Sequence, residues 1–376
     1  MSSRLIAIAC CAATLFGCGE DGAPPATIRF LHTFNPDETE LFNATIAERG
    51  LAVDSSLVPF ARGQQVISEI LHAKTGCPDL IRIDATWLPG LRAQLLPVPP
   101  ELAALDWTPE AAALGQLEPG PAWGVPQAVD GLIVIRDSAS PAPATASIAD
   151  LIAASRAARS EGRRYPLGIR VDGYWLVPWL RSEGADLAAG GIDGPGAARA
   201  LASFAAVFGD VAAPPPPSGS EAPDELRRWN AHEVAYWITG PWQLGALRDA
   251  DRVAVSAIAR APRGGQLLVV PACAKNPDQG WRLAGELASL PVAIKLAQAF
   301  STVPTRISAL ASAPPLARAA YEALRGAEML PRVAVTPLLF DDLNPALAAV
   351  VAGDATAEEA IEGVRRGWGR LVRGPP

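Results

Sequence analysis

The sequence predicts an α/β fold in which helices cover mostly parallel strands, and three observations support this prediction. Strand-like and helix-like segments alternate along most of the chain, which is the order expected of parallel strands joined by helices. The chain has 376 residues, 49% of them apolar, enough for one large core or for two smaller cores with a cleft between them. Aromatic residues follow several predicted strands, where α/β folds bind their ligands.

The N-terminus has the pattern of a secretion signal. Arg4 provides a positive charge, and residues 5–16 form an apolar run of twelve residues. Crossing a bilayer takes about 20 apolar residues, so this run fits a signal peptide over residues 1–17 better than a membrane helix. It ends in the tetrapeptide LFGC, which resembles a bacterial lipobox. We therefore expect lipidation of Cys18 and a tether over residues 18–26; a buried N-terminal helix is the alternative.

The first part of the mature chain has the pattern of a single α/β unit. Apolar residues repeat at helical spacing in one candidate helix, where Leu41, Phe42 and Ile46 share a face. Strands and helices are expected in alternation over residues 27–31, 38–48, 51–58, 64–74 and 79–83. The order strand-helix-strand-helix-strand predicts a mostly parallel sheet.

The middle of the chain continues the alternation. Strands are expected over residues 132–135, 167–170, 234–238 and 253–258. One intervening helix begins after Ser147, with Asp150 three residues later as in a capping box, and another covers residues 195–208. Residues 212–223 contain four consecutive prolines, which predicts a surface loop of polyproline type and not a linker between domains.

The last part of the chain is mostly helical. A strand is expected over residues 266–272, followed by helices over 277–288, 292–301 and 356–372. Thr356 and Glu359 have the spacing of a capping box at the start of the final helix.

Charge and motifs argue against several classes of function. The formal net charge is −7 with acidic and basic residues interspersed, so nucleic acid is not an expected partner. The sequence has no phosphate-binding P-loop and no G-x-S-x-G nucleophile motif, and His32, His72 and His232 lack the spacing of metal ligands. We therefore expect no catalytic residue, no metal and no cofactor. An enzyme that uses two carboxylates remains the alternative, because any fold can bring two of them together.

Aromatic residues are the most informative candidates for a ligand site. Trp87, Tyr174 and Trp242 each follow a predicted strand, and Pro241 places Trp242 at the start of a helix. An aromatic ring offers a flat apolar face to the C–H face of a sugar, while carboxylates and amides bind the sugar hydroxyls. This combination favours a sugar as the ligand. Other tryptophans lie inside helical patterns and are expected in the core: Trp179, Trp281 and Trp368.

Five segments, in this order, resemble the extracellular solute-binding proteins of ABC importers of the maltose-binding type. They are AKTGCPDLIRIDATWLPGL (73–91), WGVPQAVDGLIVIRD (123–137), YWITGPWQL (236–244), VVPACAKNPDQGWRLAGELASL (269–290) and VAGDATAEEAIEGV (351–364). The resemblance implies the type II periplasmic-binding-protein fold, whose mixed sheets are flanked by helices. Two lobes, joined by three crossings, would close like a hinge on a ligand in the cleft between them. Lobe one would hold residues 27–130 and 266–305, and lobe two 131–265 and 306–372.

The resemblance also implies which residues bind the sugar. At stacking positions lie Tyr174, Trp242 and Phe340. The carboxylates that would bind sugar hydroxyls are Asp130, Asp84 and Glu38. Trp87 is similar to the branch of the family that binds disaccharides such as trehalose and maltose. One position departs from the family, because Gln127 stands where an aromatic or apolar residue is common.

The family resemblance implies a function as well. The chain would be an extracytoplasmic, lipid-anchored protein, a monomer and not an enzyme. It would capture a di- or oligosaccharide by hinge closure and deliver it to the permease subunits of an ABC importer. A secreted carbohydrate-active hydrolase and a sensory or scaffold lipoprotein are the alternatives. Amino acids, polyamines or ferric ion could also replace the sugar, although four tyrosines do not favour iron.

The resemblance finally implies a disulfide between Cys77 and Cys273, the two cysteines that remain once the signal peptide and Cys18 are set aside. In the resembled fold the strand 266–272 returns antiparallel beside the strand 79–83. The carboxyl end of one strand then adjoins the amino end of the other. An oxidising compartment outside the cytoplasm permits the bond. Two buried free thiols are the alternative.

Overall fold

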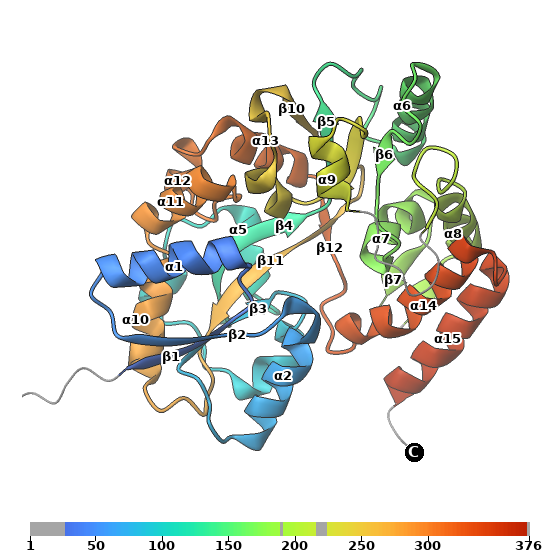
Figure 1. Cartoon of the computed structure of the whole chain (residues 1–376). Coiled ribbons are helices and arrows are strands. Elements are labelled where there is room, and N and C mark those ends of the chain that lie inside the picture. Colours follow the sequence, from blue (N-terminus) through green and yellow to red (C-terminus); the bar gives the residue numbers. More distant parts are fainter. Residues whose placement is uncertain (1–26, 189–190, 216–223, 374–376) are drawn as a thin grey trace, which may run out of the picture.

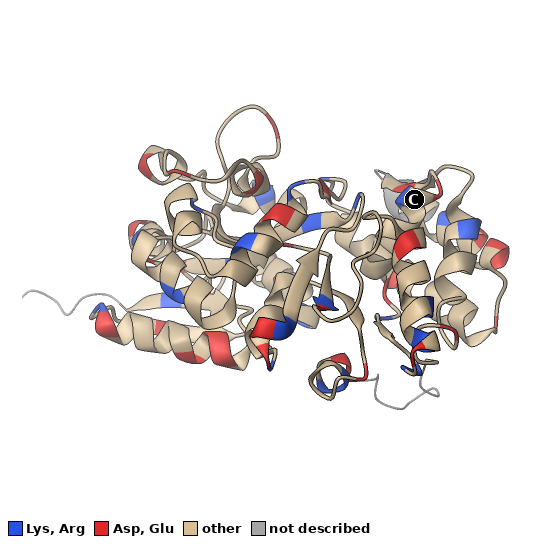
Figure 2. Cartoon of the chain, turned by 90° about the horizontal axis from the view of Figure 1, so that it is seen from above, with Lys and Arg blue, Asp and Glu red and all other residues tan. Residues whose placement is uncertain are grey.

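A computed structural model describes residues 27–188, 191–215 and 224–373. The predicted signal peptide, Cys18 and the tether lie outside the described residues, as does most of the proline-rich stretch 212–223. Figure 1 shows that the described residues form two lobes side by side. Figure 2 shows from above that acidic and basic residues are interspersed over both lobes. The two-lobed α/β fold that the sequence predicts is confirmed, whereas the exact lobe boundaries stay a prediction.

Lobe one is built on a mixed sheet. Its strands follow the order β12-β11-β3-β1-β2, with β4 also paired to β11. They are β1 (Ile28–His32), β2 (Val53–Leu57), β3 (Leu80–Asp84), β4 (Val125–Gly131), β11 (Pro262–Val269) and β12 (Glu328–Met329). The strands β3, β1 and β2 are parallel, and β11 runs antiparallel to β3 and β4. The predicted antiparallel neighbours are thus confirmed, with Leu267 paired to Ile83 and Val269 to Ile81.

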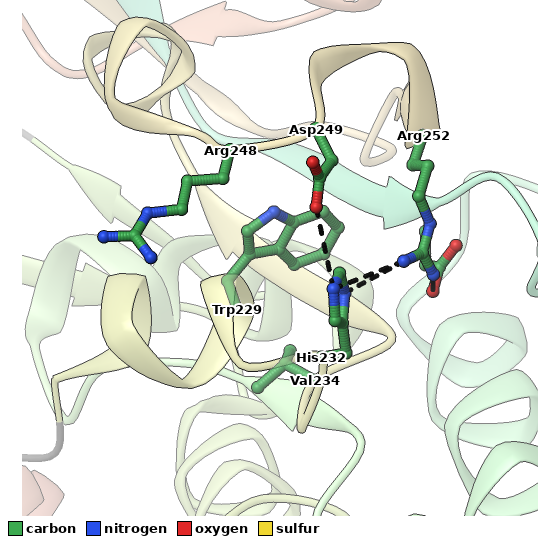
Figure 3. Close-up of a pocket in the computed structure, with 7 residues that line it drawn as sticks. Trp229, His232, Val234, Arg248, Asp249 and Arg252 are labelled. Atoms are coloured by element: carbon green, nitrogen blue, oxygen red, sulfur yellow. Dashed lines mark hydrogen bonds and ion pairs between the residues drawn. The ribbon is translucent and has the colours of Figure 1, made fainter.

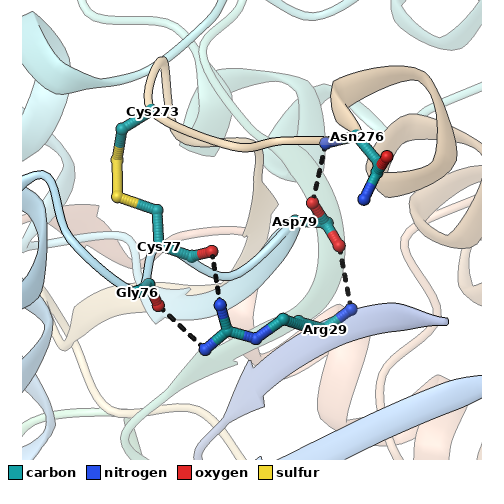
Figure 4. The surroundings of a disulfide bond; sticks show 6 residues. All are labelled: Arg29, Gly76, Cys77, Asp79, Cys273 and Asn276. Carbon is teal, nitrogen blue, oxygen red and sulfur yellow. Dashed lines mark hydrogen bonds between the residues drawn. A yellow bond between two sulfur atoms is a disulfide. The ribbon is translucent and has the colours of Figure 1, made fainter. Parts of the chain in front are cut away.

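This strand pairing places two cysteines next to each other. Cys77 precedes β3 and Cys273 follows β11, and a disulfide joins them with a Cα–Cα distance of 5.9 Å (Figure 4). It is the pair that the sequence analysis predicts. Nearby, the buried carboxylate of Asp79 accepts hydrogen bonds from the backbone N–H groups of Arg29 at 3.0 Å and Asn276 at 2.9 Å. Together the disulfide and Asp79 join β1, the loop before β3 and the segment after β11.

Lobe two contains a second sheet with the strand order β10-β5-β9-β6 and a hairpin of β7 and β8. The strands are β5 (Ile133–Asp137), β6 (Leu167–Gly168), β7 (Asp186–Ala188), β8 (Gly191–Asp193), β9 (Tyr236–Thr239) and β10 (Val253–Ser256). The strand β6 is shorter than the predicted strand 167–170, because helix α7 (Gly173–Ser182) begins soon after it. Asp172 caps this helix by accepting a hydrogen bond from the N–H of Tyr174 at 2.8 Å.

Helices pack against both sheets (Figure 1). The first part of the chain supplies α1 (Pro36–Glu48), α2 (Phe60–Ala73), α3 (Leu88–Leu91), α4 (Pro100–Ala103) and α5 (Pro109–Gly115). The middle supplies α6 (Ile148–Ser160), α7, α8 (Ala197–Ala205) and α9 (Glu225–Asn230). The last part supplies α10 (Pro277–Leu287), α11 (Leu290–Phe300), α12 (Ile307–Ala311), α13 (Pro315–Leu324), α14 (Leu339–Ala352) and α15 (Ala357–Arg373). Short 3-10 turns are η1 (Arg92–Gln94), η2 (Pro241–Ala246), η3 (Ala250–Arg252) and η4 (Thr336–Leu338).

Local sequence explains where several helices begin. The hydroxyl of Ser147 accepts a hydrogen bond from the N–H of Asp150 at 3.1 Å. In the predicted box before α15, the hydroxyl of Thr356 accepts from the N–H of Glu359 at 3.2 Å, and the Glu359 carboxylate accepts from the N–H of Thr356 at 3.0 Å.

The three tryptophans expected in the core are buried: Trp179, Trp281 and Trp368.

A buried arginine ties two of the interlobe crossings to lobe two. The chain crosses between β4 and β5, between β10 and β11, and after β12 (Figure 1). The side chain of Arg181 on α7 is 1% exposed, and its Nε donates to the carboxylate of Asp186 at 3.0 Å. Its Nη1 donates to the carbonyl oxygens of Arg260 at 2.9 Å and Glu328 at 3.3 Å, and its Nη2 to that of Met329 at 3.3 Å. The first of these carbonyls belongs to the second crossing, and the other two belong to β12, next to the third.

Two glycines allow the crossing strands β4 and β11 to approach closely. A Cβ atom at Gly265 would lie 2.2 Å from the carbonyl oxygen of Ala128, and one at Gly131 would lie 2.7 Å from that of Pro262. No side chain fits at such distances. Glycine at these two positions is therefore a requirement of the pairing between β4 and β11, next to the first and second crossings.

Candidate functional site

Polar side chains gather at the carboxyl end of β3 in lobe one. Asp84 ends this strand and is paired in register with Gln266 of β11. The Oδ1 of Asp84 accepts hydrogen bonds from the N–H and the hydroxyl of Thr86, at 2.8 and 2.5 Å, and its Oδ2 accepts one from Gln266 Nε2 at 3.2 Å. Asp130 lies near the end of β4, on the other side of β11. Burial raises the pKa of both carboxyl groups, that of Asp130 to about 6.

A buried arginine lies on the same strand, two residues before Asp84 and on the same face of the sheet. The Nε of Arg82 donates to Gln127 Oε1 at 3.0 Å, and its Nη1 donates to Thr33 Oγ1 at 3.0 Å. Its guanidinium carbon lies 4.5 Å from the centroid of the Phe34 ring. The positive charge is thus held in lobe one by neutral partners.

The charges of the three predicted acids act on this guanidinium. Burial lowers the pKa of Arg82, and the negative charges of Glu38, Asp130 and Asp84 counteract that effect. Glu38 also closes the capping box of α1, where its Oε2 accepts a hydrogen bond from the N–H of Asn35 at 3.0 Å. It lines a pocket beside α1 to which Gln127 and Phe34 also contribute. Glu38 therefore has a local structural role besides its place near the acids.

Tyr174 belongs to lobe two and contacts β11 of the lobe-one sheet. It lies in the first turn of α7, and its hydroxyl donates to the carbonyl oxygen of Pro262 at 3.3 Å. Burial raises the pKa of the Tyr174 phenol well above its usual value, and the negative charges of Asp84 and Asp130 raise it further. The hydrogen bond to Pro262 places the phenol at the start of β11, where Gly264 pairs with Asp130 and, two residues on, Gln266 pairs with Asp84. The fold thus unites three predicted residues that are far apart in the sequence.

Trp242 continues the aromatic surface from Tyr174. The ring of Trp175 lies edge-on to both, with centroids 5.8 Å from Tyr174 and 6.3 Å from Trp242. The Nε1 of Trp175 donates to the carbonyl oxygen of Ile238 at 2.8 Å, which fixes its indole on the lobe-two sheet. Trp242 is 40% exposed and folds back over Gly240, where a Cβ atom would lie 2.0 Å from the indole ring. This contact explains the glycine of the Gly-Pro-Trp motif.

Phe340 reaches the start of α7 from α14. A Cβ atom at Gly173 would lie 2.8 Å from Phe340 Cδ1, so Phe340 contacts the residue next to Tyr174. The N–H of Gly173 also donates to Asn344 Oδ1 at 2.7 Å. All three predicted stacking residues therefore belong to one part of lobe two.

Trp87 lies in a different setting. The backbone N–H of Trp87 donates to the carbonyl oxygen of Asp84 at 3.0 Å, which places it one turn beyond the acids. Its side chain is 6% exposed, and its ring centroid lies 5.3 Å from that of Phe60, which is 53% exposed. Within this pair Phe60 presents the exposed ring.

Sequence reasoning missed four residues of this region: Arg82, Gln127, Gln266 and Phe60. Arg82 could have been found, because a charged residue in the otherwise apolar strand LIRID requires buried polar partners. Gln127 was noted only as a departure from the family pattern. Gln266 and Phe60 carry no local signal, since their roles depend on strands and rings that are distant in the sequence.

A further pocket lies in lobe two and shares no residue with this site (Figure 3). His232 and Asp249 line it, together with Arg252, whose Nη1 lies 3.2 Å from His232 Nδ1. The Asp137 carboxylate accepts hydrogen bonds from Arg252 at 3.0 Å and from Arg163 at 2.9 Å. Most charges here are thus matched within the protein.

Among the described residues, no group of His, Cys, Asp or Glu side chains is arranged to hold a metal ion. In the same residues no single helix is long and apolar enough to span a membrane; α10 and α11 reach that length only as a pair bent by 54°.

Comparison with known proteins finds matches among solved structures. No family model and no curated protein sequence matches the chain. The GacH receptor of Streptomyces glaucescens, solved unliganded and with acarbose, superposes with a TM-score of 0.79 at 24% identity over 93% of this chain and 99% of its own. The maltose/maltodextrin-binding domain MalE of Bdellovibrio bacteriovorus, bound to maltotriose, gives 0.78 at 14% identity over 93% and 100%.

A third similar solved structure is bound to a different sugar. An ABC transporter solute-binding protein from Thermotoga lettingae, bound with α-D-tagatose, gives a TM-score of 0.75 at 21% identity over 91% of this chain and 98% of its own. The chain therefore has, over nearly its whole described length, the two-lobed fold of these solute-binding proteins.

Proposed function

We propose that this protein is an extracytoplasmic binding lipoprotein that captures a di- or oligosaccharide between its lobes and delivers it to the permease subunits of an ABC importer. The observation that carries the proposal is the hydrogen bond from Tyr174 of lobe two to Pro262 at the start of β11, the strand that pairs with β4 at Asp130 and with β3 at Asp84. Rings for stacking and acceptors for hydroxyls are what a sugar site requires. The fold supports the proposal, since solved proteins that share it are bound to sugars.

In this proposal the protein binds its ligand without transforming it and acts as a monomer. The competing functions are a secreted carbohydrate-active hydrolase and a sensory or scaffold lipoprotein. A thermal-shift screen over a sugar panel tests binding, because a ligand at 100 times its dissociation constant stabilises a protein by about 2.7 kcal/mol. Unchanged sugar after prolonged incubation is the expected result; release of shorter sugars would favour the hydrolase.

Replacing Tyr174 or Trp242 by alanine is expected to weaken binding of the sugar found in that screen by about 1–3 kcal/mol, as for a buried aromatic anchor. Isothermal titration calorimetry measures the change. Trp281→Ala is the matched control, since Trp281 is 9% exposed and packs in the lobe-one core. This control should lower stability more than the site variants do and leave affinity nearly unchanged. Full affinity in both site variants would contradict the stacking role.

Membrane attachment is proposed to depend on Cys18. Cys18→Ser is expected to release the protein from the membrane fraction or to leave an uncleaved precursor, because the lipid-bearing thiol is lost. Cell fractionation with immunoblotting measures this, and Cys11→Ser inside the predicted signal is the matched control that should remain attached. Equal membrane fractions for Cys18→Ser and the unchanged protein would rule out the anchor.

A further inference from the structure

The lobe-one part of the site contains one buried acceptor that the described residues do not satisfy. The side chain of Gln266 is 6% exposed, and its Nε2 donates to Asp84. Its Oε1 is buried, and no donor among the described residues reaches it. A buried acceptor without a donor is costly. A ligand group that donates at this point would remove that cost.

Negative charge is also in excess here. Asp84 and Asp130 are both largely buried, and within the described ranges neither forms an ion pair. Among the described residues, the guanidinium of Arg82 acts on both of them, and its hydrogen bonds go to the neutral groups of Thr33 and Gln127. Glu38 adds a third negative charge to the same surroundings.

Lobe two does not correct this imbalance. The charged groups that act on Tyr174 from its own side are Asp172, which makes its surroundings more negative, and Arg181, whose guanidinium is held by Asp186 and the interlobe carbonyls. Arg170 lies near Asp172, with its guanidinium carbon 5.0 Å from the Trp175 ring centroid. Each lobe thus brings at least as much negative charge to the site as positive charge.

A neutral sugar would donate hydroxyls to these acceptors but would leave the charge of Arg82 alone to offset the buried carboxylates, which is unfavourable in a site closed from water. An ammonium group supplies three N–H donors and one positive charge. We propose that the ligand carries a protonated amine, as an amino sugar does, and that this ammonium is bound by Gln266 Oε1 together with the carboxylates of Asp130 and Asp84. Tyr174 then contacts the sugar ring and the cation. This inference rests on the proposed function.

The test compares sugars that differ only in the amine: glucose with glucosamine, galactose with galactosamine, and cellobiose with diglucosamine. Isothermal titration calorimetry near neutral pH, where the amine is mostly protonated and the Asp130 carboxyl is mostly ionised, gives the ratio of dissociation constants within each pair. We expect the amine to bind at least about ten-fold tighter in the pair that the protein accepts. Equal affinity within that pair would overturn the inference and leave the sugar-binding function standing.

Two variants test whether Asp130 and Gln266 cause the preference for the amine. Asp130→Asn keeps the shape of the side chain, and Gln266→Leu removes the unpaired oxygen; each is expected to reduce the ratio several-fold. Because the ratio is taken within a pair, a general loss of affinity cancels. Asp37→Asn, which removes an exposed charge from α1, is the matched control that should keep the ratio. A ratio that survives both site variants would overturn the assignment.

A protonated amine can belong to an amino sugar or to a polyamine, and spermidine distinguishes these two classes of ligand. Failure of spermidine to bind while an amino sugar binds is the expected result. Binding of spermidine without any sugar would uphold the cation site and contradict the sugar-binding function. Absence of binding throughout the panel would count against both proposals.

Discussion

Replacing Cys77 and Cys273 together by alanine is expected to lower the free energy of unfolding by about 4–5 kcal/mol, because the bond closes a loop with a sequence separation of 196. Ligand affinity should stay close to that of the unchanged protein. The disulfide lies at the amino end of β3, whereas Asp84 lies at its carboxyl end, about 13 Å from the first residue of the strand at the usual rise.

Urea unfolding followed by tryptophan fluorescence measures this change. The unchanged protein, refolded with and without a reductant, should reproduce the difference, while the double variant should not respond to the reductant. Thiol counting on denatured, unreduced protein provides an independent control. Two free thiols in the mature chain, together with a free energy of unfolding that is the same with and without the reductant, would contradict the disulfide.

Replacing Arg181 by methionine is expected to lower the free energy of unfolding by about 3–5 kcal/mol, the range for breaking a buried charged contact. Methionine has a similar length but donates no hydrogen bond. The carbonyl oxygens of Arg260, Glu328 and Met329 would lose their charged donor, and the two crossings would lose their common attachment to α7. Urea unfolding again measures the effect.

Arg260→Met is the matched control for this prediction. Arg260 pairs with Glu328 at the same crossings, but their side chains are 50% and 46% exposed. Exposed ion pairs contribute about 0–1 kcal/mol, so this variant should remain near the stability of the unchanged protein. Equal losses in the two variants would show that burial of Arg181 does not determine its contribution.

The fold was largely predictable because its signals are local or come from segments whose order matches a known fold. Residues that are neighbours in the sequence determine the capping box of Thr356 and Glu359 and the turn at Gly240. The pairing of Cys77 with Cys273 needed the resembled strand order as well, because spacing alone does not choose partners. The strand at Leu167 was predicted too long, since the cap formed by Asp172 acts from outside it.

The candidate site was predictable only in part. Aromatic and acidic residues after strands could be selected from the sequence, and the fold brings Tyr174, Asp84 and Asp130 together. Sequence could not give the environment of each side chain, which depends on distant partners. Trp87 illustrates this, because its ring is buried against Phe60 although it follows a strand as the exposed Trp242 does. Gln266 matters only because β11 pairs with β3.

Gly131 and Gly265 have a consequence for the geometry of lobe closure. Arg181 holds the second and third crossings to lobe two, so we expect rotation to take place at these glycines, at the lobe-one ends of the first and second crossings. Points near a rotation axis travel short arcs, and Asp130 and Gln266 are the direct neighbours of these glycines in sequence. Their positions should barely depend on the opening angle, whereas Trp242, farther out on lobe two, should sweep a long path. A ligand would then meet the acids first and the indole last, and the distance that the indole travels would set how much of a longer ligand becomes enclosed.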